Sequence, residues 1–123
     1  MNNYIYVKMD TDEINNILNE CTICVLGTSN YDYPYLVPMY FIYEYKNNNY
    51  LFILESKCMG RKIKNILNNN KVCIFIQYND TDCYKSIIAN GIANINKLHN
   101  TKRTNMVSIN ITIDEIEGRA YYK

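Results

Sequence analysis

The sequence has 123 residues, of which 48% are hydrophobic and 20% charged, so it holds one globular domain without room for a second core. Thirteen basic and 12 acidic residues leave a formal charge of +1, which argues against a dedicated nucleic-acid binder. Five cysteines cannot all pair within one chain, no apolar run reaches the roughly 20 residues of a membrane span, and the N-terminus lacks a signal-peptide layout, so we expect a cytoplasmic protein.

The first predicted elements are a helix and a strand. Asp10 and Glu13 have the spacing of a capping box, which predicts a helix start. Three apolar residues follow on one helical face: Ile14, Ile17 and Leu18. Residues 22–28 are β-branched and apolar, which is typical of a buried strand.

The next segment predicts a hairpin. Residues 35–45 indicate one long strand, and residues 50–55 its partner across the loop 46–49. Pro38 lies inside the long strand and donates no hydrogen bond to a ladder, so we expect an edge, a bulge or a break there.

The second half predicts a short helix over 60–67 and three more strands. The strands cover 72–76, part of 84–95 and 107–113, and the last alternates apolar and polar residues with period two. Gly91 indicates a bulge or a close backbone approach. The whole pattern predicts a mainly β protein: a six-stranded antiparallel small barrel with an N-terminal helix and a short helix after the third strand.

Several possible sites are better explained as ordinary structure. Cys21 and Cys24 form a CxxC motif, but a structural zinc site needs a second close pair, so we expect cysteines that fill the core and no metal. His99, the only histidine, lies in a polar segment and is expected to be solvated. The acidic stretch 114–117 is expected to be a solvated face.

The most informative stretch follows the strand 50–55. Ser56 comes directly after the strand, and Gly60, Arg61 and Lys62 open the next helix. Free N–H groups at a helix start, a hydroxyl and fixed cations together favour a phosphate monoester. Cations at this end oppose the helix dipole, and a bound anion would compensate for them. The alternative is a solvated basic first turn.

The order strand, Ser, Gly-Arg-Lys, helix, strand resembles the FMN-binding split-barrel family. That family includes pyridoxamine 5′-phosphate oxidases, general-stress flavoproteins and nitroimidazole-resistance reductases. Gly27-Thr28 followed by residues 33–39, and the strand 86–93 with its glycine, resemble further family motifs in the same order. The resemblance extends over about residues 9–116 and implies one FMN-binding split-barrel domain over residues 1–123.

The resemblance also implies roles for individual residues. Ser56, Arg61 and Lys62 match the positions that hold the FMN phosphate. Pro38 and Met39 lie in the strand whose backbone passes the isoalloxazine ring. The resemblance implies a homodimer with the flavin at its interface, where Ser86 would lie near the flavin of the partner subunit. The exposed aromatic strand 35–45 would suit such an interface.

Two departures argue against narrower assignments within the family. Glu55 stands where the nitroimidazole-resistance members often have histidine, and the absence of Trp argues against vitamin B6 oxidation. We therefore expect an FMN-dependent oxidoreductase acting on a small molecule, with Glu55 the only carboxylate to test as catalytic. Two alternatives stay open: a flavin-binding or flavin-storing protein without turnover, and a small barrel whose tyrosines stack single-stranded nucleic acid.

Overall fold

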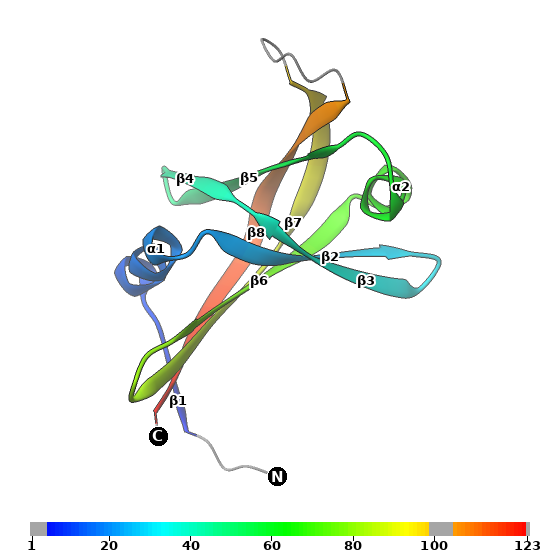
Figure 1. Cartoon of the computed structure of the whole chain (residues 1–123). Helices are drawn as coiled ribbons and strands as arrows, with labels where there is room; N and C mark the ends of the chain where they lie inside the picture. Colours follow the sequence, from blue (N-terminus) through cyan, green and yellow to red (C-terminus); the bar gives the residue numbers. More distant parts are fainter. Residues whose placement is uncertain (1–4, 99–104, 123) are drawn as a thin grey trace.

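The computed structural model describes residues 5–98 and 105–122, and the single histidine, His99, lies outside them. These described residues are mainly β, with one eight-stranded sheet and two short helices (Figure 1). The elements are β1 (Tyr6–Lys8), α1 (Thr11–Glu20), β2 (Ile23–Asn30), β3 (Tyr33–Tyr40), β4 (Ile42–Lys46), β5 (Asn49–Lys57), α2 (Arg61–Asn68), β6 (Lys71–Asn79), β7 (Cys83–Lys97) and β8 (Met106–Tyr122).

The strands form one antiparallel sheet in the order β3-β2-β6-β7-β8-β5-β4, with β1 added on β8. The sheet curls around the core, because β3 at one end contacts β5 near the other end. Among the described residues, no ladder joins β3 to β4 or β5, so the barrel is split there. Figure 1 shows α1 and α2 on opposite sides of this curled sheet.

The prediction of six strands is wrong at two places in the chain. The long strand expected over 35–45 is interrupted at Phe41, which is buried and separates β3 from β4. Residues 6–8, which carry no turn signal and are too short for a clear period, form β1 against β8. Pro38 does not cause the interruption, because it lies within β3. This strand pairs only with β2, so it is an edge strand, and of the edge, bulge or break expected at Pro38 the edge is confirmed.

The core is built from alternating residues of the central strands. The fully buried side chains include Leu26, Leu54, Phe52, Ile74, Ile76, Ile87, Ile109 and Ile111. The predicted period of two is therefore confirmed for β8. This strand does not end at residue 113 but continues to Tyr122, because β7 offers a partner along its whole length. The acidic stretch 114–117 is thus part of a strand, with Asp114 and Glu115 exposed.

Gly91 lies at a register shift between β7 and β8, which confirms the predicted bulge. A Cβ at this position would overlap the carbonyl group of Thr112, so the two backbones approach too closely for any side chain.

Both helices dock through an apolar face. α1 buries Ile14, Ile17 and Leu18, the stripe that the sequence predicts, and α2 buries Ile63 and Ile66. Neither of these helices is long and apolar enough to cross a membrane, within the part of the chain that the structure describes.

The five cysteines are all free, and their positions differ. Cys24 and Cys83 are core residues, and Cys21 packs against the core, as predicted. Burial raises the pKa of the Cys24 thiol to about 12. Cys58 is exposed in the segment before α2, so the expectation of a core role is wrong for this residue.

Candidate functional site

A pocket of about 480 Å³ lies where the barrel is split. We call it the split pocket. Its lining comes from β3, β4, β5, α2 and the start of β8: Val37, Pro38, Met39, Tyr40, Phe41, Ile42, Ile53, Glu55, Ser56, Lys62 and Met106. Five of the residues singled out from the sequence, Pro38, Met39, Glu55, Ser56 and Lys62, are therefore brought together.

One end of the split pocket is polar and cationic. Lys62 lies in the first turn of α2, and Ser56 lies near the end of β5 with only 4% of its surface exposed. The Ser56 hydroxyl donates to the carbonyl of Lys57 at 2.8 Å, so a bound anion would receive this proton only after the side chain rotates. Among the described residues, no side chain caps α2 and no acidic residue lies in its first turn. The first N–H groups of this helix therefore lack intrahelical partners close to the cations.

Two side-chain hydrogen bonds, one of them buried, fix the position of α2. The side-chain amide of Asn65 donates to the Thr28 hydroxyl at 3.0 Å, and both groups are buried. One turn later, Asn69 donates to Ser29 at 3.0 Å. These contacts hold α2 on β2, which in turn pairs with the edge strand β3.

The other end of the split pocket is apolar and ends at an open strand edge. The backbone N–H of Phe41 donates to the Thr22 carbonyl at 3.0 Å. Alternate residues of an antiparallel strand point their backbone groups to the same side, so residues 35, 37 and 39 also face β2. Pro34 and Pro38 then fall on the unpaired side, where their missing N–H costs no ladder bond. The carbonyl of Pro38 is left for another partner along this edge.

Arg61 is separated from Lys62. Its guanidinium lies 5.2 Å from the centre of the Tyr35 ring, and it lines a second pocket of about 800 Å³. Consecutive helical residues point in different directions, which explains the separation. The prediction that both cations hold one phosphate stays a prediction.

Ser86 does not line the split pocket of its own chain. It lies on β7 with its neighbours Gln77 and Arg119 on either side, and it is 7% exposed. Its strand positions place it on the same outer face of the sheet as Ile88, two residues along. Its predicted role toward the flavin requires a second chain on this face.

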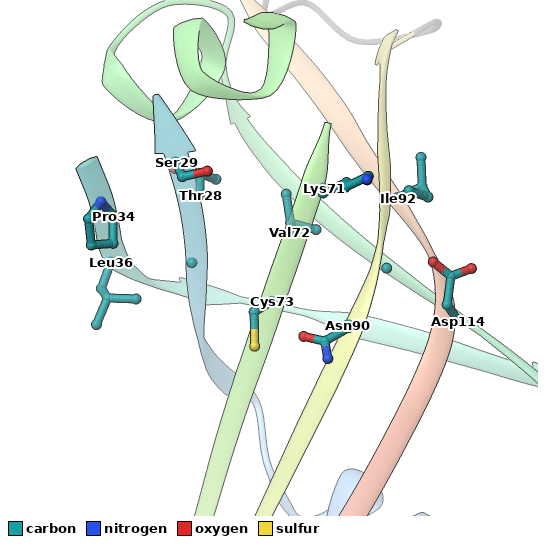
Figure 2. Close-up of a pocket in the computed structure, with 12 residues that line it drawn as sticks. Thr28, Ser29, Pro34, Leu36, Lys71, Val72, Cys73, Asn90, Ile92 and Asp114 are labelled. Atoms are coloured by element: carbon teal, nitrogen blue, oxygen red, sulfur yellow. The ribbon is translucent and has the colours of Figure 1, made fainter. Parts of the chain in front are cut away.

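The outer face of β2, β3, β6 and β7 carries uncovered apolar side chains. The exposed ones are Ile23, Leu36, Tyr40 and Ile88. A hollow of about 490 Å³ lies on this face. Figure 2 shows four of its lining residues on neighbouring strands: Leu36, Cys73, Asn90 and Asp114. Gly27 lines the hollow between Leu36 and Cys73, where an added Cβ would lie 3.2 Å from the Leu36 side chain.

The sequence predicted the linear motif of the split pocket but missed residues from other strands. Val37, Phe41, Ile42, Ile53 and Met106 complete its apolar lining. Each resembles an ordinary strand residue in the sequence, and the pairing of β5 with β8 is what brings Met106 next to Ser56. Knowing that the last strand pairs with residues 50–55 would have identified some of them, but the sequence alone does not specify this pairing.

Residues 10–108 match the sequence profile of the family described as Pyridoxamine 5′-phosphate oxidase. No curated protein matches the chain by sequence.

Solved structures share the fold at low identity. A proposed 5-nitroimidazole antibiotic resistance protein from Bacteroides thetaiotaomicron has a TM-score of 0.80 at 20% identity, covering 98% of this chain and 90% of its own. A FAD-binding protein from Mesorhizobium loti has a TM-score of 0.79 at 18% identity, covering 98% and 99%. A FAD-binding protein from Mycobacterium smegmatis has a TM-score of 0.74 at 15% identity, covering 95% and 99%. These similarities establish the arrangement of the strands.

Proposed function

The chain belongs to the pyridoxamine 5′-phosphate oxidase family, and on that premise we propose that it is a flavoprotein that binds FMN in the split pocket. We further propose that it is an oxidoreductase acting on a small molecule. The observation that carries the proposal is the meeting of a cationic, donor-rich end and an apolar slot in one pocket of about 480 Å³.

The residues present fit the chemistry of FMN. A phosphate monoester needs cations and donors, and Lys62, Ser56 and the uncapped start of α2 supply them. A flat ring needs apolar walls, and Val37, Met39 and Met106 line the same pocket. Pockets for ligands of this size occupy roughly 300–1,000 Å³, so the volume also fits.

The flavin would supply the redox chemistry, and the protein would supply phosphate binding, ring orientation and electrostatics. The open edge of β3 offers the carbonyl of Pro38 to a ring donor. Glu55 lines the same pocket and is exposed, so it is the carboxylate positioned to meet a substrate that approaches the ring.

Two structural neighbours support a flavin ligand, because their descriptions name FAD binding. The similarity to a proposed nitroimidazole resistance protein concerns the fold. Glu55 stands at the position where the resemblance implies a histidine in the nitroimidazole-resistance members. We therefore propose reduction or oxidation of a small molecule without choosing nitroimidazoles or vitamin B6.

A homodimer is part of the proposal. The split pocket is open at the sheet edge. Nearby, the apolar side chains of Ile23, Leu36, Tyr40 and Ile88 are exposed, as at a protein interface. A second copy on this outer face would bury them and would bring its own Ser86 toward the split pocket. The proposed compartment is the cytoplasm, since all five cysteines are free.

The first test is direct binding. We expect the purified protein to bind FMN with a visible flavin spectrum, and Lys62→Ala to weaken this binding by about 10- to 100-fold, because a charge-assisted hydrogen bond contributes roughly 1.5–3 kcal/mol. Lys46→Ala, in the hairpin between β4 and β5, is the matched control and should bind like wild type. No FMN binding by wild type would overturn the proposal.

Two further measurements complete this test. An equal loss for Arg61→Ala would show that both cations reach the phosphate, and no loss would restrict phosphate binding to Lys62. Bleaching of the bound flavin by NADH or NADPH supports an oxidoreductase. A flavin-storing protein would instead hold a bound flavin that NADH and NADPH do not reduce, and that an acceptor does not reoxidise after reduction with dithionite.

A further inference from the structure

The second pocket, which Arg61 lines, lies between the β2–β3 turn and the first turns of α2. We call it the turn pocket. Its volume of about 800 Å³ exceeds that of the split pocket. The lining residues that bear on its chemistry are three tyrosines and two cations: Tyr31, Tyr33, Tyr35, Arg61 and Lys64. Among the described residues that line it, none is acidic.

The aromatic rings of the turn pocket are available for stacking. Tyr31 is 87% exposed and Tyr33 is 80% exposed, so large ring surfaces meet solvent without a protein partner. The third ring, Tyr35, already carries the Arg61 guanidinium on its face. The turn holds Tyr31 with φ 49° and Asp32 with φ 70°, a left-handed conformation that such residues rarely adopt.

The combination of rings and cations selects a ligand class. Tyrosines stack on nucleobases, and arginine and lysine bind phosphate. A neutral aromatic ligand would leave the two cations without a counter-ion, and inorganic phosphate would not use the exposed rings. The chemistry that uses both is a base joined to a phosphate.

The location of the turn pocket adds a geometric argument. Lys62 lines the split pocket, whereas its neighbours Gly60 and Arg61 line the turn pocket, so the start of α2 separates the two. Gly60 has no side chain, and a Cβ there would meet nothing within 4 Å, so the space directly beside the helix start is open. The helix start therefore presents no Gly60 side chain to a ligand that reaches from Lys62 toward Arg61.

We propose that the turn pocket binds the adenosine 5′-phosphate part of a dinucleotide. This inference rests on the proposed function only in placing a flavin in the split pocket. The adenosine phosphate has two possible sources with the same chemistry. It is either one half of FAD, whose flavin half would occupy the split pocket, or one half of NADH or NADPH bound beside FMN.

The test uses AMP, FAD and NADPH as probes in calorimetric titrations. The variant is Tyr33→Ala combined with Lys64→Ala, because both side chains are exposed and lie outside the split pocket. We expect wild type to bind AMP, and the double variant to lose at least about tenfold in AMP affinity while binding FMN like wild type. The matched control is Tyr45→Ala combined with Lys46→Ala in the β4–β5 hairpin, which should change neither affinity.

Competition distinguishes the two sources. If FAD is the source, wild type binds FAD more tightly than FMN, and AMP competes with FAD. If NADPH is the source, FMN-loaded protein binds NADPH, and AMP competes with NADPH. No AMP binding by wild type, or AMP, FAD and NADPH affinities that the double variant leaves unchanged, would overturn the inference. If wild type binds AMP but does not bind FMN, the proposed function is overturned and this inference stands.

Discussion

The two helices of this small barrel begin in opposite ways. α1 starts at Asp10, whose carboxylate accepts from the backbone N–H of Glu13 at 2.9 Å, and its first turn holds Asp12 and Glu13. α2 starts at Gly60, where no described side chain forms a cap, and Arg61 and Lys62 fill its first turn. The first arrangement satisfies free N–H groups and complements the helix dipole, and the second does neither.

The difference separates stability from binding. α1 needs no ligand, because its own side chains stabilise its start and Ile14, Ile17 and Leu18 pack into the core. α2 keeps unfavourable cations and open N–H groups beside a pocket, which lowers the stability of the empty protein and raises its affinity for an anion. The start of α1 is therefore an internal control for the start of α2.

Reversing the charge at α2 should have the largest effect. We expect Lys62→Glu to weaken FMN binding by at least about 100-fold, since it removes an attractive charge and adds a repulsive one. The same change should raise the stability of the flavin-free protein by about 0.3–1 kcal/mol, because glutamate suits a helix N-terminus. Flavin titration and urea unfolding measure the two effects.

The mirror substitution is the control for this prediction. Glu13→Lys in α1 should lower stability by a similar amount and leave FMN affinity unchanged. Losses of both stability and FMN affinity in Lys62→Glu would mean that Lys62 supports the fold rather than a ligand.

Removing the cap of α1 should have a medium effect. We expect Asp10→Ala to lower the free energy of unfolding by about 1 kcal/mol, since it leaves the N–H of Glu13 without its acceptor. FMN binding should not change. Chemical denaturation measures the loss, with Asp82→Ala, in the loop before β7, as the control. A change in FMN affinity equal to that of Lys62→Ala would remove the contrast between the two helices.

The last prediction concerns how α1 is held on the sheet. The Tyr50 hydroxyl donates to Asn15 on α1 at 2.6 Å, and burial raises the pKa of Tyr50 to about 12. The unfolded chain ionises its tyrosines near pH 10, so the unfolded state gains stability between about pH 10 and 12 while folded Tyr50 stays protonated. Stability from this group is therefore complete below pH 10 and is lost as the pH rises to 12.

The check is a comparison of unfolding at several pH values. Tyr50→Phe cannot ionise, so its stability should fall less steeply with pH than that of wild type over this range. Identical slopes for the two proteins would contradict the assignment of this pH dependence to Tyr50.

Local patterns predicted part of the fold because they act over few residues. The cap at Asp10, the period of two in β8 and the bulge at Gly91 depend only on near neighbours and backbone sterics. The break at Phe41 and the extension of β8 beyond residue 113 depend on distant partners, β2 and β7. Acidic residues are rare in strands, yet Glu115 pairs with Asn90 of β7, and Asp114 is the residue without a partner at the bulge opposite Gly91.

The candidate site divides in the same way. Ser56 and Lys62 were found from the sequence because one strand–loop–helix segment carries both. The separation of Arg61 from Lys62 follows from the roughly 100° between successive helical residues, so it was predictable in principle. The contribution of Ile53, Met39 and Met106 to one pocket was not, because it depends on how the sheet curls and splits.

The central claim is that the start of α2 binds the phosphate of a flavin. The most direct measurement is the ratio of the dissociation constants of riboflavin and FMN, in wild type and in Lys62→Ala. The account predicts that wild type prefers FMN by at least about tenfold, and that Lys62→Ala loses this preference while its riboflavin affinity stays the same. Equal affinity of wild type for the two flavins, or an equal loss of both in the variant, would contradict it.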